Sequence, residues 1–428
     1  MELDVKGKRA RARSSSSSGG GGLTGGDRLS SLPDCLIHHI MSFMKARQVV
    51  QTCVLSTRWK HLWRSVPCLD IDQEEFKTGE DSDHEWEKFE DFTDHLLIPN
   101  NISIALLDTF RLHVRSYWAR HAARWIRHGI KYSTREPGMQ HQGLSSNSWR
   151  LRRLYLNNLY LDYNFTEHVS SGCQNLENLE LKSCRCTFYE ISSHSLENLI
   201  LKNCEFSELS AITSPALKSL VFESCNSFCY ERLYSLLVIT APAVAYLLLD
   251  VDAYLLDGGV SLEDMPSLGK ASIKIRSNKE ESKLSQDQIK LLCSVSNVTS
   301  LVLLGFETMV HGEDQVAFPN FRNLRTLFLD NCDLCDNFKT LEHFLKNSPD
   351  LEKLTLRCCK FSKDLKKKKA KSKRASSSQC LNLVDIHCEN LKHTEIIYKD
   401  DDVRQLVELL LSISANLPNN NIKLTKVD

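Results

Sequence analysis

The chain has 428 residues, of which 42% are hydrophobic and 25% charged, as in an ordinary soluble globular protein. It is too long for one ordinary domain, and its 54 Lys and Arg residues balance 54 Asp and Glu residues, so net charge indicates no class of partner. No run of about 18 apolar residues occurs, so we expect neither a transmembrane helix nor a membrane partner.

The 16 cysteines come without a secretory signal pattern, because the basic start is followed by Ser14–Ser18 and Gly19–Gly22 instead of an apolar stretch. We therefore expect reduced thiols in the cytosol or the nucleus, and no disulfide framework. Residues 1–26 form a basic, Ser/Gly-rich segment that is too polar to fold, and order is expected to begin near Asp27.

Residues 27–68 show a helical pattern. Ser30 or Ser31 can cap a first helix that tolerates the early Pro33, because the N–H that proline lacks would be unpaired there. Further helical stretches are predicted at 49–54 and 59–63. Three short helices make a very small core, so we expect this domain to need a partner.

Residues 69–148 are predicted to be an acidic connector that leads into the next domain. Between Asp70 and Asp94 there are twelve acidic residues against Lys77 and Lys88, which indicates a solvated segment that is partly helical around Trp86. Mixed helix and strand follow, and then a loop with Pro137 and Gly143.

A repeat occupies residues 149–362. Its clearest copies start at Leu151, Leu176, Leu196, Leu324 and Leu351, each with further leucines three and five residues on. In several copies the ninth position is a cysteine: Cys184, Cys204, Cys225, Cys332 and Cys359. Alternate strand residues share a face, so the leucines at positions four and six point inward, and a small buried ninth residue can close the turn. Stacked units of this kind form one continuous core and are typical of leucine-rich repeats.

A basic insertion at 363–380 and a C-terminal segment at 381–428 complete the chain. The insertion's basic cluster predicts nuclear import, and its members are Lys366, Lys367, Lys368, Lys369, Lys371, Lys373 and Arg374. A solvated loop, phosphate binding and contact with the acidic segment remain alternatives. The last segment is predicted to hold a strand at 395–398, a helix at 403–413 and a strand at 422–424.

Residues 29–63 closely resemble an F-box, through Leu32-Pro33-Asp34, Val54-Leu55-Ser56 and Arg58-Trp59. The amino-acid sequence of this stretch resembles plant F-box/leucine-rich-repeat proteins in particular. The end of the chain resembles the FBD-like C-terminal cap of that group. The fold class implied is α/β: a three-helix F-box followed by an irregular leucine-rich-repeat solenoid with a parallel concave sheet.

This resemblance implies a division of labour. The F-box would bind a Skp-family adaptor, and through it cullin and RING subunits, while the repeats hold a protein substrate for ubiquitination. The residues carried over as adaptor contacts are Leu32, Pro33, Leu36, Ile37, Ile40, Met41, Val54, Leu55 and Trp59.

Residues between the inward leucines are expected on the concave face. Those that we take as substrate-contact candidates are Tyr155, Asn178, Glu180, Lys182, Asn198, Lys202, Phe328, Asp330 and Arg357; Asn157, Ile200 and Thr355 share the face. No metal, cofactor or catalytic pattern is apparent, and the pair Cys332 and Cys335 has no second pair at zinc-site spacing.

The sequence thus predicts a non-catalytic ubiquitin-ligase subunit in the nucleus or cytoplasm, with the nucleus favoured. A non-degradative F-box scaffold and a chromatin- or nucleic-acid-associated binding protein remain the alternatives.

Overall fold

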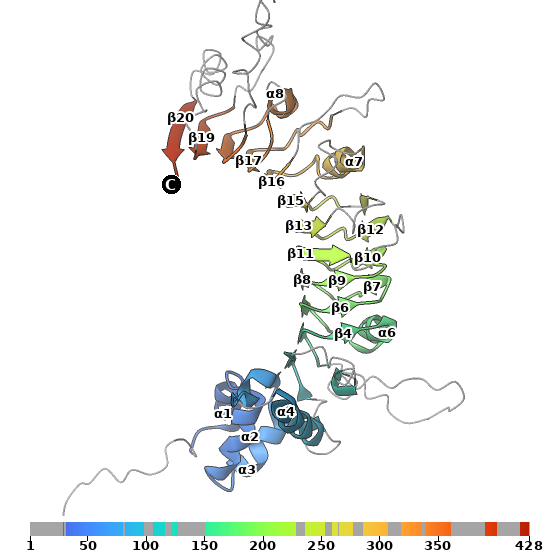
Figure 1. Cartoon of the computed structure of the whole chain (residues 1–428), viewed down its shortest axis with the longest axis vertical. Coiled ribbons are helices and arrows are strands. Elements are labelled where there is room, and N and C mark those ends of the chain that lie inside the picture. The colour runs from blue at the N-terminus through green and yellow to red at the C-terminus, as the bar shows by residue number, and fades with distance from the viewer. Residues whose placement is uncertain are drawn as a thin grey trace, which may run out of the picture.

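The computed structural model places a helical module at one end of a long, curved parallel sheet (Figure 1). The predicted fold class is confirmed. The structure describes residues 29, 31–79, 82–97, 106–115, 122, 124–126, 150–227, 236–252, 259–263, 265–276, 286–306, 318–334, 339–360, 390–399 and 420–427. The 1–26 segment, the import cluster at 366–374 and the predicted helix at 403–413 lie outside these residues.

The helical module follows the pattern read from the sequence. It comprises α1 (Asp34–Met41), α2 (Ala46–Gln51), the 3₁₀ turn η1 (Thr52–Val54), α3 (Trp59–Leu62) and the 3₁₀ turn η2 (Trp63–Ser65). Pro33 stands at the N-cap of α1, where its missing N–H costs no hydrogen bond. Ile37, Met41, Val49 and Trp59 are buried and form the core of the module.

One parallel sheet runs through the rest of the described chain. Its order is β1-β2-β3-β5-β8-β11-β13-β15-β16-β17-β18-β19-β20, so the strands follow one another along the chain. These strands are β1 (Cys68–Asp72), β2 (Thr109–His113), β3 (Arg153–Asn157), β5 (Asn178–Lys182), β8 (Asn198–Lys202), β11 (Ser219–Ser227), β13 (Tyr246–Asp252), β15 (Lys270–Arg276), β16 (Ser300–Leu304), β17 (Thr326–Asp330), β18 (Lys353–Arg357), β19 (His393–Tyr398) and β20 (Asn421–Lys426). Each unit therefore contacts its neighbours, as in a solenoid.

The outer side of the arc carries helices and short strands, while the long sheet lines the inner side (Figure 1). The helices are α6 (Tyr163–Gly172), α7 (Gln286–Ser294) and α8 (Lys339–Lys346). A second parallel sheet has the order β14 (Val260–Glu263), β12 (Leu237–Thr240), β10 (Ala211–Thr213) and β7 (Glu190–Ser192). Between the two run β4 (Tyr160–Leu161), β6 (Arg185–Cys186) and β9 (Glu205–Phe206). The leucines of the repeat fill the space between the layers.

The ninth-position cysteines close the turns after the strands, as predicted. The Cys204 thiol donates to the Leu181 carbonyl at 3.3 Å, and the Cys225 thiol donates to the Leu201 carbonyl at 3.3 Å. The residue before each cysteine has a positive φ, for example 50° at Asn203. A small, weakly donating side chain therefore fits under the turn and links it to the preceding strand.

The sheet begins earlier than expected, within the predicted acidic connector. β1 pairs with β2, and β2 with β3, in the register of the later repeats. Between β1 and β2 lie the 3₁₀ turn η3 (Gln73–Phe76) and α4 (Ser82–Leu97), whose Trp86 and Phe89 are buried against Trp125. The apolar side chains among the carboxylates decide the structure here. Most of the acids of α4 are exposed or half-buried, whereas Asp72 and Glu85 are buried.

At the C-terminal end, β19 and β20 continue the sheet where strands were predicted. Within the described residues, no helix combines the length and the apolar character needed to cross a bilayer.

Candidate functional site

The helical module exposes a disproportionate share of large apolar side chains. Twelve such side chains are exposed among the described residues, and six of them fall within residues 29–55: Leu29, Leu36, Ile40, Phe43, Val54 and Leu55. Phe43 is 78% exposed and Val54 83% exposed, values that are costly to leave against water. Such a concentration marks an interaction surface, and we call these six residues the apolar surface of the module.

The local structure explains this exposure. Leu36 and Ile40 are four residues apart, so they lie on one side of α1, while Ile37 and Met41 point into the core. Phe43 follows the end of α1, and its ring contacts the His39 ring with centroids 5.0 Å apart.

The structure divides the predicted adaptor contacts into two groups. Pro33, Leu36, Ile40, Val54 and Leu55 are exposed and available to a partner. Ile37, Met41 and Trp59 are buried, and Leu32 packs partly buried against the core, so these four shape the surface without forming it. Leu29 and Phe43 are exposed as well but are not among the predicted adaptor contacts, because the sequence pattern does not tell an outward-facing apolar side chain from a core one.

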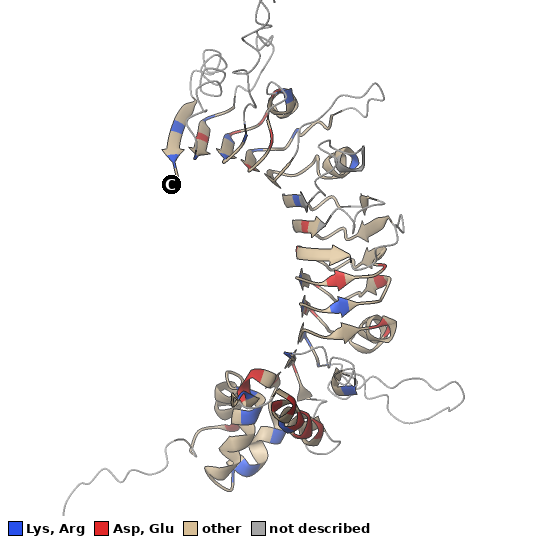
Figure 2. Cartoon of the chain, in the orientation of Figure 1, with Lys and Arg blue, Asp and Glu red and all other residues tan. Residues whose placement is uncertain are grey.

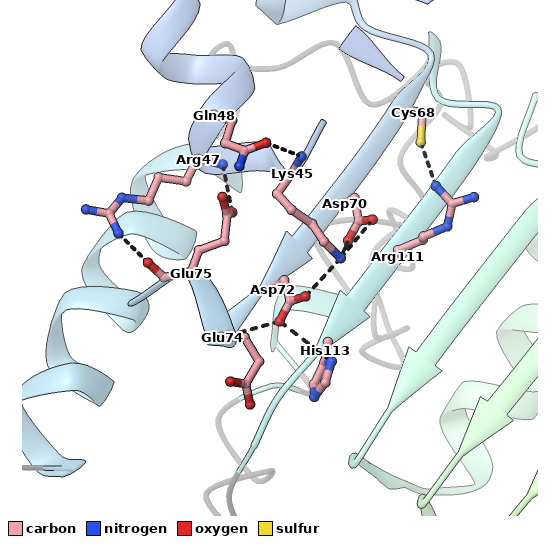
Figure 3. Close-up of polar contacts among 10 residues, drawn as sticks. All are labelled: Lys45, Arg47, Gln48, Cys68, Asp70, Asp72, Glu74, Glu75, Arg111 and His113. Carbon is pink, nitrogen blue, oxygen red and sulfur yellow. Dashed lines mark hydrogen bonds and ion pairs between the residues drawn. The ribbon is translucent and has the colours of Figure 1, made fainter. Parts of the chain in front are cut away.

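A polar joint fixes the module to the start of the sheet (Figure 3). Lys45, between α1 and α2, places its Nζ 3.1 Å from Oδ1 of Asp70 and 2.8 Å from Oδ2 of Asp72, both on β1. Asp72 Oδ1 also accepts a hydrogen bond from the Glu74 N–H at 2.9 Å and lies 3.6 Å from His113 Nδ1 on β2. One lysine thus joins the module to the first strand.

The second half of the joint is made by Arg47 on α2. Its backbone N–H donates to Glu75 Oε2 at 3.3 Å, its guanidinium donates to the Glu75 carbonyl, and its Cζ lies 4.8 Å from the centre of the Phe76 ring. Because α2 packs directly on β1, the joint combines ion pairs with buried apolar contact.

The ion pairs and hydrogen bonds of the joint shift the pKa values of Asp72 and Lys45. Burial acts to raise the pKa of Asp72, but the hydrogen bonds from Lys45 and from the Glu74 N–H outweigh burial and hold that pKa below its usual range. Burial acts to lower the pKa of Lys45, but Asp70 and Asp72 outweigh burial and raise that pKa above its usual value. Both groups are therefore held in their charged forms.

Some of the other acidic residues of this region also have cationic partners. Figure 2 shows that acidic residues dominate α4. Arg124 pairs with Asp94 at 2.9 Å, Trp125 donates to Asp94 at 2.6 Å, and Arg115 pairs with Glu74 at 2.9 Å. These carboxylates therefore take part in ion pairs and hydrogen bonds within the region.

The concave face of the sheet is the second candidate site. The structure places all nine substrate-contact candidates on strands that line this face: Tyr155, Asn178, Glu180, Lys182, Asn198, Lys202, Phe328, Asp330 and Arg357. They do not form one cluster, because β3 and β17 are seven strand spacings apart, about 34 Å at about 4.8 Å each.

Two smaller groups within this set do come together. Asn198 Nδ2 donates to Asn178 Oδ1 at 2.8 Å across β5 and β8. Arg357 pairs with Asp330 at 2.7 Å and lies 5.8 Å from the centre of the Phe328 ring. Asp330 is itself buried, so its carboxylate serves mainly to position the Arg357 guanidinium.

The structure also reveals concave residues that sequence reasoning missed. Val221, Leu248 and Val302 occupy the same register row as Tyr155 and Phe328 and are half-buried on this face. Each lies between two inward apolar residues, so in the sequence it looks like part of a buried run. The register of the neighbouring strands is the signal that identifies them.

Among the residues that the structure describes, no group of three or more His, Cys, Asp or Glu could hold a metal ion. The nearest cysteine neighbours, such as Cys184 and Cys204, are buried in the turns that they close.

Comparison with known proteins agrees with this arrangement. A family model described as the F-box domain matches residues 29–70, and one described as the leucine-rich repeats of an FBD-associated F-box protein matches residues 138–252. The meiotic F-box protein MOF of Oryza sativa subsp. japonica is 29% identical over 94% of this chain and 86% of its own length. An F-box/FBD/LRR-repeat protein of Arabidopsis thaliana is 27% identical over 78% of this chain and 80% of its own.

Proposed function

Because the chain is an F-box/leucine-rich-repeat protein of the kind found in plants, we propose that it is the substrate-recognition subunit of an SCF-type cullin–RING ubiquitin ligase. The module would bind a Skp-family adaptor through its apolar surface. The concave sheet would bind a protein substrate and present it for ubiquitination and degradation.

The observation that carries this proposal is the separation of two binding surfaces by a fixed joint. The apolar surface of the module lies outside its own core, so a partner can cover it without unfolding the module. The joint of Lys45, Asp70 and Asp72 ties that surface to the sheet. A substrate on the concave face is then held in a set orientation relative to the adaptor, as transfer of ubiquitin to the substrate requires.

The docking claim can be tested by co-purifying the full chain with a Skp-family adaptor. We expect Ile40→Arg to weaken adaptor binding at least about tenfold, or about 1.4 kcal/mol, because a charge would be buried in an apolar contact. Phe43→Ala should also weaken binding, by lost burial alone. Both side chains are exposed in the free chain, so folding should be kept.

Tyr163→Arg is the matched control, since Tyr163 is an exposed large side chain on α6, outside the module. Equal adaptor binding by wild type, Ile40→Arg and Phe43→Ala would refute docking through this surface. Substitution of Leu32 and Pro33 is a poorer test, because Leu32 packs on the core and Pro33 caps α1.

Degradation is tested separately from docking. If the chain acts in a ligase, the purified complex contains cullin, and a bound protein accumulates when the proteasome is inhibited. Adaptor binding without cullin would favour the non-degradative scaffold. In either case the chain has no catalytic step of its own, because F-box/leucine-rich-repeat proteins act generally as non-catalytic adaptors.

We also propose that the chain works in the nucleus as well as the cytoplasm, on the strength of the basic cluster at 366–374. Removing these residues from a tagged full chain should lower the nuclear fraction. An unchanged nuclear fraction would contradict import through this segment, and a lost salt-dependent affinity for DNA or RNA would instead favour nucleic-acid binding.

A further inference from the structure

The middle row of the concave face changes character along the sheet. The residues of this row are those between the two inward positions of each strand. Over six adjacent strands, β8 to β17, this row reads Ile200, Val221, Leu248, Ser272, Val302 and Phe328. All six are half-buried, and all but one are apolar. We call these residues the apolar stripe.

The stripe has defined ends. Before it, the row continues to Glu180 on β5, and after it to Thr355 on β18. It spans five strand spacings, about 24 Å at about 4.8 Å each. The stripe is therefore a bounded feature of the central repeats, and both ends of the concave face are more polar.

The rows on either side of the stripe carry little free charge. On one side, Lys202 pairs with Glu223 at 3.1 Å, Lys274 with Asp250 at 3.2 Å, and Arg357 with Asp330 at 2.7 Å. On the other side the residues are mostly uncharged: Asn198, Ser219, Tyr246, Lys270, Ser300 and Thr326. Charge complementarity thus favours an occupant whose contact strip is apolar and whose borders are neutral, and it disfavours a nucleic acid or a strongly acidic peptide.

The stripe offers its occupant no backbone hydrogen bonds. The N–H and C=O groups of the interior strands are directed at neighbouring strands in a parallel ladder, and the stripe side chains are almost all hydrocarbon. An extended peptide laid across them would keep its own backbone groups unpaired on the buried side. An α-helix satisfies these groups internally, so it can cover the stripe without that cost.

The spacing between neighbouring strands also favours a helix over an extended peptide. One turn of an α-helix advances about 5.4 Å, close to the strand spacing of about 4.8 Å, so successive apolar side chains of a helix can sit near successive strands. Side chains on one face of an extended peptide recur about every 6.6 Å and fall out of step. A helix of about 16 residues would span the stripe at about 1.5 Å per residue.

We propose that the apolar stripe is a docking site for an amphipathic α-helix of a partner protein, laid across β8 to β17 with its apolar side on the sheet. This inference deepens the proposed function, since it names the structural class of the substrate's recognised segment. The helix would cover Leu248 near its middle and Phe328 near one end.

The test uses the full chain in complex with a Skp-family adaptor and two display libraries as probes. One library presents stable single helices of about 16–20 residues randomised on one side; the other presents unstructured 12-residue peptides. We expect binders from the helix library whose Kd rises at least tenfold for Leu248→Lys and for Val302→Lys. Phe328→Ala, a truncation that inserts no charge, should weaken the same binders several-fold.

Asn157→Lys is the matched control, because it introduces the same charge on the concave face at β3, outside the stripe; Kd should change less than twofold. Enrichment of unstructured peptides alone, no enrichment from either library, or equal Kd values for wild type and stripe variants would each overturn the proposal. Adaptor co-purification, measured on the same samples, reports separately on the proposed function, because the stripe and the apolar surface of the module share no residue.

Discussion

Among the described residues, six other than glycine adopt a left-handed backbone, five of them directly after a strand and one within β11, and they show what each repeat requires of its sequence. They are Asn158, Ser183, Asn203, Ser224, Asn331 and Cys358. The N–H of Asn203 donates to the Glu223 carbonyl at 2.7 Å, and the N–H of Asn331 donates to the Arg357 carbonyl at 2.7 Å. The conformation thus directs a backbone donor at the next repeat, and asparagine tolerates it better than most residues do.

Cys358 is the least suited of the six to this conformation, with a φ of 49°. We predict that Cys358→Asn stabilises the fold by about 1 kcal/mol, because a side chain that tolerates positive φ relieves a local cost. Urea denaturation of the two proteins would measure the change, with Asn331→Ala as a control expected to destabilise. A lower midpoint for Cys358→Asn would contradict this account of the backbone cost.

The sequence pattern predicted the turns of the repeats better than it predicted which apolar side chains of the module are exposed. The cysteine at the ninth position is recognisable because it recurs with the leucines, and its hydrogen bond to the preceding strand follows from its burial. Exposure of Phe43 and burial of Trp59 do not follow from the sequence in the same way, since both are large and apolar. Which of them points outward depends on how three short helices pack.

At the scale of elements, the contact between α2 and β1 determines how the module is held. We predict that Lys45→Ala costs about 1 kcal/mol of stability, since partly exposed ion pairs contribute little individually and this lysine serves two aspartates. The loss should appear as faster hydrogen exchange in α2 and β1. Lys60→Ala is the control: Lys60 is an exposed lysine of α3, and its substitution should leave that exchange unchanged.

The same contact should depend on pH in a defined direction. The pKa of Asp72 is lowered in the folded chain, so its contribution is present above the ordinary Asp pKa of about 3.9 and is lost as pH falls through the lowered value. The pKa of Lys45 is raised, so its contribution is present below the ordinary Lys pKa of about 10.4 and is lost as pH rises through the raised value.

The contribution of the pair Lys45 and Asp72 should therefore be constant between about pH 5 and pH 9. Unfolding curves of wild type and of an Asp72→Asn variant should run parallel within that window and converge at acid pH. A difference between them that grew as pH fell would contradict the assignment.

The joint also shows why the sequence predicts a solvated, partly helical connector where the structure has β1 and α4. Counting carboxylates between Asp70 and Asp94 predicts a solvated chain, yet Leu69 and Ile71 alternate with the acids of β1, and Trp86 and Phe89 recur along α4. Periodic burial of a few apolar side chains determined the elements, while the acids found partners in Lys45, Arg115 and Arg124. Those partners lie far enough apart in sequence that pattern reading cannot connect them.

At the scale of the whole molecule, one hydrophobic core runs from Ile37 in the module to Ile396 on β19. The leucine spacing predicted this continuity over the repeats, because each unit needs a neighbour to cover its apolar edge. It did not predict the apolar stripe, which exists only once Ile200, Val221 and Leu248 are in register across three strands. Register is a property of the assembled sheet and is not visible within one repeat.

The continuous core gives the helical module a second role, as the cap on the first strand. We predict that a chain lacking residues 1–66 exposes the apolar side chains of β1, such as Leu69 and Ile71, and that amide protection falls at least about tenfold in β1 and β2. Protection in β16 to β18 should be unchanged, because repeats of a solenoid interact chiefly with nearest neighbours and the disturbance fades along the array. Hydrogen exchange of the full and shortened chains, followed by mass spectrometry, measures both ends at once.

Equal loss of protection at β1 and at β17 would mean that the array unfolds as a single unit. The fading pattern would instead mean that deleting the F-box changes the sheet only near its start and leaves the central concave face intact.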